Sequence, residues 1–231
     1  MHVILIPGFW LQGESWAPIT PTLVAAGHHV LTPTLPGKES AAADQAGVGL
    51  RTHIDAIVSL VDELTGPVAL VGHSGGGAIA HGVVDARPER IARVVYVDSG
   101  PLGEGAVIND DFEPEGHGIP LPDWGAFEDE ELADLDETLR TEFRRIAVPE
   151  PIGVATEPQR LSDERRYDVP VTVITCTMPR ELLEQFIAGG HPYVAELAHM
   201  RDREIVELPT GHWPQLTKPH ELAAIIETAL G

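Results

Sequence analysis

Short runs of apolar, often β-branched residues alternate along this chain with longer segments of helical periodicity. The runs are of strand length and apolar at nearly every position, a pattern typical of strands that are covered on both faces. Such alternation predicts βα units, and therefore an α/β fold with a mostly parallel, doubly wound sheet. The predicted strands are residues 3–6, 29–32, 68–71, 91–97, 171–176 and 204–208, and the predicted helices are residues 15–26, 51–64, 76–86, 180–188 and 219–230.

The size and charge of the chain exclude several classes of protein. Its 231 residues are enough for one domain, and 43% of them are hydrophobic, which suffices for a buried core. The formal net charge of −21, with Lys38 and Lys218 as the two lysines, argues against nucleic acid and against an anionic membrane surface as partners. The single cysteine, Cys176, excludes an intrachain disulfide and a cysteine-only metal site.

The N-terminal residues and the lengths of the apolar runs indicate the expected location of the protein. The N-terminal residues lead directly into the first predicted strand, without a basic segment or a small-residue cleavage site. No apolar run approaches the ~20 residues that a transmembrane helix needs. We therefore expect a cytoplasmic protein without a membrane partner, and the sequence leaves a homo-oligomer open.

One long segment interrupts the alternation between the predicted strands at 91–97 and 171–176, and it is too long for a plain crossover. Residues 103–168 include 19 acidic and 6 basic residues, a net charge of −13, and such charge runs are usually solvated surfaces. Residues 128–146 nevertheless have the pattern of one or two amphipathic helices. We predict a helical cap insertion at about 103–168 within a single domain, whose apolar side chains cover a pocket: Phe112, Trp124, Phe127, Leu132, Leu135, Phe143 and Ile146.

The strongest motif is Gly72-x-Ser74-x-Gly76, which directly follows a predicted strand and opens a predicted helix. A nucleophilic serine at such a strand-to-helix turn occupies strained backbone, so its neighbours two positions away must be small. The following helix N-terminus favours developing negative charge. A phosphate-binding loop would need a lysine at its end, and none is near. The context therefore predicts Ser74 as a catalytic nucleophile.

A serine nucleophile needs a general base, and chain position selects one of the eleven histidines. His212 lies between the last predicted strand and the last predicted helix, at the same carboxyl edge of the sheet as Ser74. The other histidines precede strands or lie within helices, where a surface or core role is expected. His73 adjoins the nucleophile, but its side chain must point away from the pocket if Ser74 points in. We expect His212 to be the base.

These features resemble the α/β-hydrolase superfamily, in which the chain order is serine, acid, histidine. The His-Gly-x-x-x-Gly-x-x-Trp opening of its plant methylesterase and hydroxynitrile lyase branch is similar to the run Pro7-Gly8-Phe9-Trp10-Leu11-Gln12-Gly13-Glu14-Ser15-Trp16, with Pro7 in place of the usual histidine. The resemblance implies that the backbone amides of Phe9 and Gly75 form the oxyanion hole.

The acid of the triad has two candidates. In most of the superfamily it follows the penultimate strand, but here residues 177–179 contain no carboxylate, and Glu181 stands where a helix begins. The other position known in the superfamily is the end of the preceding strand, where this chain has Asp98. Because the usual position is empty, we favour Asp98 over Glu181.

The resemblance implies a serine esterase that cleaves a carboxylic ester or lactone of a small molecule through an acyl-enzyme, without a cofactor and without a metal. Trp10, Trp124, Phe127 and Trp213 are expected to line the substrate pocket. Two alternatives remain: a non-hydrolytic member of the fold, such as a hydroxynitrile lyase or a carbon–carbon bond-cleaving enzyme, and a small-molecule receptor on a hydrolase scaffold. The lyases of this branch use a lysine after the penultimate strand, where this chain has Arg180.

Overall fold

The structure is a computed structural model that describes residues 1–231. A six-stranded, wholly parallel sheet with the strand order β2-β1-β3-β4-β7-β8 forms its centre, which confirms the predicted fold class. The strands coincide with the six apolar runs to within two residues at each end. They are β1 (His2–Ile6), β2 (His29–Leu31), β3 (Val68–His73), β4 (Ile91–Val97), β7 (Val171–Thr175) and β8 (Arg203–Glu207).

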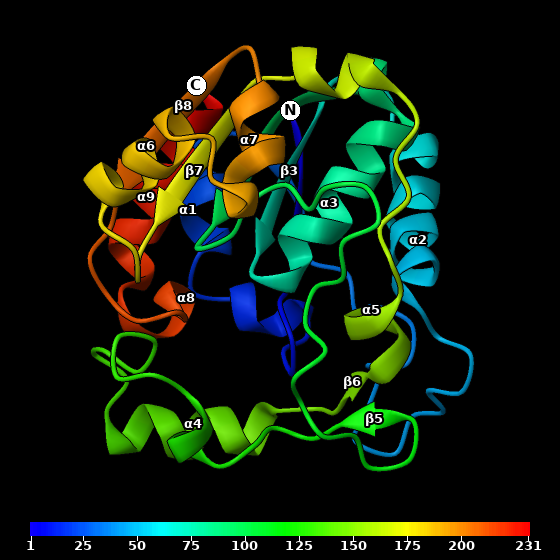
Figure 1. The fold of residues 1–231 in the computed structure, drawn as a ribbon, viewed down its shortest axis with the longest axis vertical. Coiled ribbons are helices and arrows are strands. Elements are labelled where there is room, and N and C mark those ends of the chain that lie inside the picture. The colour runs from blue at the N-terminus through cyan, green and yellow to red at the C-terminus, as the bar shows by residue number, and fades with distance from the viewer.

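Helices cover both faces of this sheet (Figure 1), which is why the inner strands β3 and β7 are buried along their whole length. Alternate side chains of β1 enter different cores: Ile4 and Ile6 belong to one, Val3 and Leu5 to the other. The first core includes side chains of α2 (Leu50–Glu63), α3 (Gly75–Ala86), α6 (Arg180–Ala188) and α7 (Ala195–His199), and the second includes side chains of α1 (Thr20–Ala25) and α9 (Pro219–Leu230).

The helix predicted at residues 15–26 is divided in two. A 3-10 turn, η1 (Gly13–Trp16), is followed by the shorter helix α1. Pro18 and Pro21 have no amide hydrogen, so a continuous helix through them would lose backbone hydrogen bonds. The other four predicted helices are present. Three short helical elements lie between the strands and helices around the sheet: η2 (Pro88–Arg90), η5 (Pro192–Val194) and α8 (Pro214–Thr217).

Most of the long segment between β4 and β7, residues 98–170, lies beyond the carboxyl edge of the sheet, at the end opposite the N-terminus in Figure 1, and its last part with η4 returns to the end where β7 begins. Of the helical periodicity expected at 128–146, only the second half forms a helix. Asp136 caps that helix, its carboxylate accepting a hydrogen bond from Leu139 N at 2.9 Å, and residues 128–135 form turns. The segment contains β5 (Gly118–Ile119), η3 (Trp124–Ala126), α4 (Glu137–Ile146), β6 (Glu150–Pro151), α5 (Ile152–Thr156) and η4 (Glu164–Asp168).

A third hydrophobic core joins the long segment to the loops at the carboxyl edge of the sheet. Its buried members come from the loop after β1 (Phe9, Trp10 and Leu11), from the start of α8 (Trp213) and from the long segment itself, including Phe143. The rings of Phe143 and Trp213 meet edge to face at a centroid distance of 5.1 Å. The aromatic side chains of the long segment therefore pack mainly against each other and against these loops.

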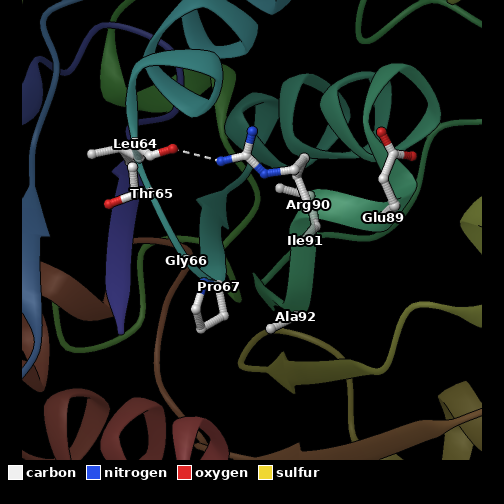
Figure 2. A pocket seen from close by; sticks show the side chains of 8 residues that line it. All are labelled: Leu64, Thr65, Gly66, Pro67, Glu89, Arg90, Ile91 and Ala92. Atoms are coloured by element: carbon white, nitrogen blue, oxygen red, sulfur yellow. Dashed lines mark hydrogen bonds between the residues drawn. The ribbon is translucent and has the colours of Figure 1, made fainter.

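The amino edge of the sheet carries a shallow depression, shown in Figure 2. Residues 64–67 before β3 and residues 89–92 around the start of β4 line it, and the Arg90 guanidinium donates to the carbonyl oxygen of Leu64 at 2.6 Å. The same two strands end at Ser74 and Asp98, so this depression lies at the opposite edge from the predicted site. The longest helix has 14 residues, and none combines the length and apolarity that crossing a bilayer requires.

Candidate active site

Ser74 occupies a sharp turn between β3 and α3, with a positive φ of 53°. The turn leaves no room for side chains on the flanking glycines. A Cβ on Gly72 would lie 2.5 Å from the Gly76 carbonyl oxygen, and one on Gly76 would lie 2.5 Å from the Ile6 carbonyl oxygen. The backbone amide of Ser74 donates to the Val97 carbonyl at 3.1 Å. These contacts hold the serine in a conformation that L-residues rarely adopt, as a strand-to-helix nucleophile turn requires.

The His212 ring lies between Ser74 and Asp98. Its Nδ1 is 2.7 Å from Asp98 Oδ2, and its Nε2 is 2.8 Å from Ser74 Oγ. An ionised carboxylate can only accept hydrogen bonds, so Nδ1 carries the proton and Nε2 is left to accept the serine hydroxyl. The three residues that the sequence selected are therefore connected by hydrogen bonds in the order that a serine–histidine–acid relay needs.

Two groups outside this relay hold the loop that carries His212. The backbone amide of His212 donates to the Glu131 carbonyl at 2.8 Å, which ties the loop to the long segment. On the other side, His73 Nε2 donates to the His212 carbonyl at 2.6 Å. Burial lowers the pKa of His73 to about 3, so its ring is neutral at pH 7. His73 thus does not line the cavity described below, as expected, and it holds the loop that carries His212.

Asp98 ends β4 with a φ of 41°, and its side chain is almost completely buried. Its Oδ1 accepts hydrogen bonds from the backbone amides of Cys176 at 2.8 Å and Thr177 at 3.0 Å, and the Thr177 hydroxyl lies 3.0 Å from Oδ2. Burial alone would raise the pKa of the Asp98 carboxyl, but the hydrogen bonds from His212, Thr177 and Cys176 outweigh it and hold the pKa below its usual range. Asp98 is therefore ionised at neutral pH.

The two candidates for the acid have different surroundings in the structure. Glu181 is exposed in the first turn of α6 and makes no hydrogen bond or ion pair with His212. The position after the penultimate strand, where an acid was expected by resemblance, is occupied by Thr177, which instead donates to Asp98. Sequence reasoning missed Thr177. A hydroxyl residue at an otherwise empty acid position was the available signal.

The amides assigned to an oxyanion hole lie beside the nucleophile. The Phe9 N–H has no hydrogen-bond partner in the chain, and Gly75 is the first residue of α3, where no helical carbonyl faces its N–H. A Cβ on Gly8 would lie 2.9 Å from Ser74 Cβ, and a Cβ on Gly75 would lie 2.8 Å from Phe9 Cε1. The loop after β1 therefore packs directly against the nucleophile turn, with two unpartnered donors close to Ser74.

Ser74 and His212 border a cavity of about 900 Å³. Its walls come from residues 98–109 after β4, from the carboxyl end of β7 with Met178 and Leu183, and from residues 192–197 of η5 and α7. The lining includes four carboxylate side chains and no lysine or arginine; the four are Asp98, Glu104, Glu131 and Glu196. This arrangement favours uncharged or cationic ligands over anionic ones.

The four residues expected in the pocket lie elsewhere. Trp10, Trp124, Phe127 and Trp213 do not line this cavity but belong to the third hydrophobic core or pack against it. Their rings pack against one another: the Phe127 ring contacts the rings of Trp10 and Trp213 at centroid distances of 5.7 and 5.3 Å. Mutual burial of these large apolar surfaces explains why they turn from the cavity to one another.

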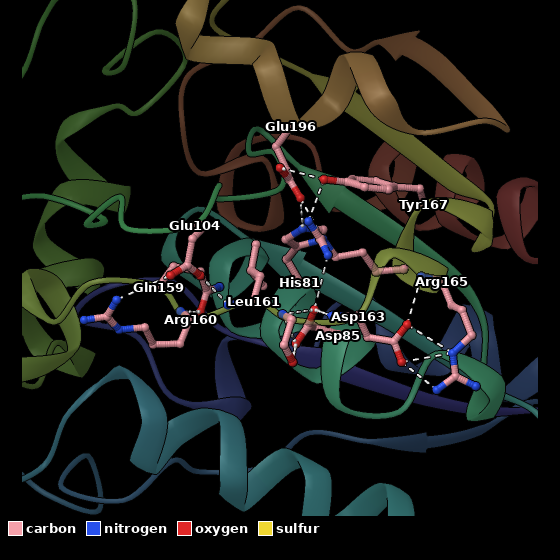
Figure 3. A network of polar contacts seen from close by, with 12 residues as sticks. His81, Asp85, Glu104, Gln159, Arg160, Leu161, Asp163, Arg165, Tyr167 and Glu196 are labelled. Atoms are coloured by element: carbon pink, nitrogen blue, oxygen red, sulfur yellow. Dashed lines mark hydrogen bonds and ion pairs between the residues drawn. The ribbon is translucent and has the colours of Figure 1, made fainter.

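Glu196 joins one wall of the cavity to a network of polar groups, shown in Figure 3. Its carboxylate accepts from His81 Nε2 at 3.0 Å and from Arg166 Nε at 2.8 Å. These partners outweigh the effect of burial and lower the pKa of Glu196 to about 2. Arg166 also pairs with Asp85 at 3.4 Å. The network connects α3, η4 and α7 behind the cavity.

The chain has no group of three or more His, Cys, Asp or Glu side chains arranged to hold a metal ion. Cys176 is buried, and burial raises the pKa of its thiol well above the usual range, which suits a core residue rather than a nucleophile. Its contribution to the site is the backbone amide that Asp98 accepts.

Comparison with known proteins identifies curated relatives among hydrolases. The chain is 37% identical over 100 residues to a carbendazim hydrolyzing esterase of Nocardioides sp., an alignment that covers 42% of this chain and 41% of that protein. The match thus spans about two-fifths of the esterase's length. Over the whole chain and 93% of the relative, it is 27% identical to the lipase LipV of Mycobacterium tuberculosis.

Solved structures share the fold. An extracellular alpha/beta-hydrolase from a Paenibacillus species superposes with a TM-score of 0.76 at 23% identity, covering 99% of this chain and 98% of that one. A methylesterase from Arabidopsis superposes with a TM-score of 0.75 at 17% identity, covering 100% and 98%. At the level of sequence, a family model described as "Alpha/beta hydrolase family" matches residues 3–225. With that match, the parallel sheet and the serine turn, the chain is a member of the alpha/beta hydrolase family, and the curated relatives named above are an esterase and a lipase.

Proposed function

We propose that the protein is a serine hydrolase that cleaves a carboxylic ester or lactone of a small molecule through an acyl-enzyme. The observation that carries the proposal is the hydrogen-bonded relay, with 2.8 Å between Ser74 Oγ and His212 Nε2 and 2.7 Å between His212 Nδ1 and Asp98 Oδ2. Relatives named as an esterase and a lipase support ester hydrolysis as the class of reaction.

The geometry suits the following steps. His212 Nε2 takes the proton of the Ser74 hydroxyl while Oγ forms a bond to the substrate carbonyl carbon. The carbonyl oxygen becomes an oxyanion within reach of the Phe9 and Gly75 amides, and the Asp98 carboxylate stabilises the imidazolium. Collapse of the intermediate breaks the bond to the alkoxide leaving group, which receives the proton from His212. A water molecule then attacks the acyl carbon while His212 takes its proton, and collapse breaks the bond to Ser74 Oγ, which releases the carboxylic acid and returns the proton from His212 to Ser74.

The charges around the cavity support an uncharged or cationic substrate. Four carboxylates line it, with no lysine or arginine, so an anionic acyl or alcohol group would meet repulsion. The same feature favours hydrolysis over cyanohydrin cleavage, which in the resembling lyases uses a cationic side chain at the site. Arg180 lies outside the cavity and pairs with Glu184 at 2.7 Å.

The test uses wild-type protein, Ser74→Ala and a p-nitrophenyl ester. We expect the wild type to release a burst of p-nitrophenol and to be labelled by a fluorophosphonate at Ser74. The alanine variant should lose both properties while keeping its melting temperature, because alanine fits the turn. Fluorophosphonate labelling that persists in Ser74→Ala would contradict the proposal, and so would a wild type that binds the ester without any turnover, which is the behaviour of a receptor.

A further inference from the structure

Lys38 and Glu150 form an ion pair that is almost wholly buried. Their side chains are 1% and 2% exposed, and Lys38 Nζ lies 2.5 Å from Glu150 Oε2. Lys38 belongs to the loop after β2, and Glu150 to β6 in the long segment, so the pair joins parts of the chain that are far apart in sequence. Lysine and glutamate are rarely buried, because removing both charges from water is costly. Neither residue lines the cavity, and the proposed reaction does not use either one directly.

The remaining hydrogen bonds of this pair go to the loop that carries the oxyanion donor. Lys38 Nζ donates to the Gly8 carbonyl oxygen at 2.9 Å, and Glu150 Oε2 accepts from the Trp10 amide at 3.2 Å. Gly8 and Trp10 are the two neighbours of Phe9. The buried pair therefore contacts the backbone on both sides of the residue whose amide is assigned to the oxyanion hole.

The contact with Gly8 acts directly on the Phe9 amide. The Gly8 carbonyl and the Phe9 N–H belong to one peptide unit, which is planar and trans, so the two groups point in opposite directions. An ammonium ion that holds the carbonyl oxygen consequently fixes the direction of the N–H. It also polarises the peptide and strengthens the N–H as a donor to negative charge. Lys38 thus orients the Phe9 N–H by binding the oxygen at the opposite edge of the same planar peptide unit.

The contact with Trp10 keeps a strained residue in place. Trp10 has a φ of 61°, a left-handed conformation that costs a bulky side chain on the order of 1–3 kcal/mol. Its polar groups are all held by the long segment: besides the amide bound by Glu150, its carbonyl accepts from Val148 N at 2.9 Å, and its Nε1 donates to the Ile119 carbonyl at 3.1 Å. Without Glu150, the backbone beside Phe9 could relax toward ordinary angles and turn the donor away.

We propose that Lys38 and Glu150 are positioning residues for the oxyanion hole, which orient the Phe9 amide through the peptide groups on either side of it. The inference rests on the proposed function, because it needs a reaction that develops negative charge on a carbonyl oxygen. The inference also predicts that replacing the ion pair lowers activity without an equal loss of stability. Replacing a buried ion pair with apolar residues of similar volume is often neutral for stability.

The experiment compares two double variants with the wild type. Lys38→Met/Glu150→Met removes the contacts to both Gly8 and Trp10. Lys38→Met/Glu150→Gln removes the contact to Gly8, while the carbonyl oxygen of the introduced glutamine can still accept from Trp10. Asp85→Asn is the matched control, because Asp85 belongs to another buried ion pair, with Arg166, and does not line the cavity.

Two readouts distinguish positioning from a merely structural role. The first is the division between kcat and KM for p-nitrophenyl acetate. The second is the affinity for an alkyl trifluoromethyl ketone, compared with the affinity for the methyl ketone of equal chain length. Ser74 Oγ adds to the carbonyl carbon of the trifluoromethyl ketone, and the carbonyl oxygen becomes an anion. For Lys38→Met/Glu150→Met we expect kcat and trifluoromethyl ketone affinity to fall together by about 10²-fold, with KM and methyl ketone affinity nearly unchanged. Lys38→Met/Glu150→Gln should lose less, and Asp85→Asn should lose stability only.

Each outcome decides the matter. If a folded double variant keeps wild-type kcat and trifluoromethyl ketone affinity, the pair has no positioning role and the inference is overturned. Should Lys38→Met/Glu150→Met fail to fold, Lys38→Met/Glu150→Gln carries the same test, since methionine cannot hold the Gly8 carbonyl. A wild type that neither turns over the ester nor binds the trifluoromethyl ketone more tightly than the methyl ketone overturns the proposed function itself, and with it this inference.

Discussion

Replacement of Asp98 by asparagine is the sharpest test of the relay, because the surroundings dictate how the new amide must lie. Oδ1 of Asp98 accepts two backbone N–H groups, from Cys176 and Thr177. An asparagine must keep its carbonyl oxygen there, since its NH₂ group cannot accept them. The NH₂ group then faces His212 Nδ1 and forces that atom to become an acceptor. The ring proton moves to Nε2, which can no longer accept the proton of Ser74.

The expected loss follows from that tautomer change. The corresponding substitution in a buried serine protease triad lowers kcat about 10⁴-fold, or roughly 5 kcal/mol of activation free energy, with the geometry preserved. We expect a similar fall in kcat for Asp98→Asn with p-nitrophenyl acetate at pH 7.5, and little change in KM. Glu181→Gln is the matched control and should retain wild-type kcat, because Glu181 is exposed and makes no contact with His212. An Asp98→Asn variant within tenfold of wild-type kcat would refute this reasoning, and an inactive Glu181→Gln would transfer the role of the acid to Glu181.

Three further predictions concern acid stability, packing and substrate charge. Burial lowers the pKa of His73 from 6.5 to about 3, so between those pH values the unfolded state binds a proton that the folded state does not. On going from pH 7.5 to 5, this difference should lower the unfolding free energy by about 2 kcal/mol. Urea titrations at the two pH values should show that His73→Gln lacks this contribution. Phe143 is fully buried, so Phe143→Ala should lower the unfolding free energy measured in urea by about 3–5 kcal/mol, while the relative rates for short and long acyl esters stay unchanged. A changed acyl preference at unchanged stability would show instead that the aromatic residues line the substrate pocket. An ester with a terminal carboxylate should show kcat/KM about tenfold below that of its neutral isostere at low ionic strength, the gap narrowing in 1 M salt, and a gap that is independent of salt would show that the cavity carboxylates do not cause it.

The strands and most helices could be predicted because their signal is local. The central strands of the sheet are apolar runs in which burial on both faces is visible as the absence of alternation, whereas the edge strands β2 and β8 are only partly buried. The exception is instructive. Residues 128–135 have helical periodicity but form turns, because the helix begins at Glu137, after the capping carboxylate of Asp136, nine residues later than periodicity alone suggests.

The cavity could not be predicted in the same way. Its walls are largely residues 98–109, which form a loop, and residues 192–197 of the short helices η5 and α7, segments whose sequences carry no periodicity and whose positions depend on contacts far along the chain. The aromatic residues of the long segment misled the prediction for a physical reason. Large apolar side chains indicate burial but not the partner, and here the partners are one another and the loops of Phe9 and Trp213.

The acid was ambiguous for a related reason. Asp98 directly follows β4 and Glu181 lies in the first turn of α6, and no residue near either one indicates which of them His212 will contact. The decision rests on the backbone N–H groups of the two residues after β7, which donate to an oxygen atom that carries no hydrogen. Such a reciprocal fit between distant residues, 98 with 176 and 177, is a property of the folded chain.

The residues with strained backbone lie where the proposed relay and the proposed oxyanion hole meet. Four residues other than glycine have positive φ: Trp10, Ser74, Asp98 and Asp134. Ser74 and Asp98 belong to the relay, Trp10 adjoins the Phe9 amide, and Asp134 follows the carbonyl of Ala133, which accepts from Gly211 N beside His212. Such conformations persist only where surrounding contacts outweigh their cost.

For three of these residues the restraining contact on the backbone amide can be named, and each comes from a different element. The Ser74 amide is held by the Val97 carbonyl of β4, the Asp98 amide by the Ile174 carbonyl of β7, and the Trp10 amide by Glu150 of the long segment. The first two restraints are backbone groups at the ends of neighbouring strands, which any sequence with this sheet supplies. The third is a side chain, and is therefore the one that substitution can remove without changing the sheet. For that reason the orientation of the oxyanion donor, rather than the relay, is where single substitutions outside the cavity should have the largest effect on the rate.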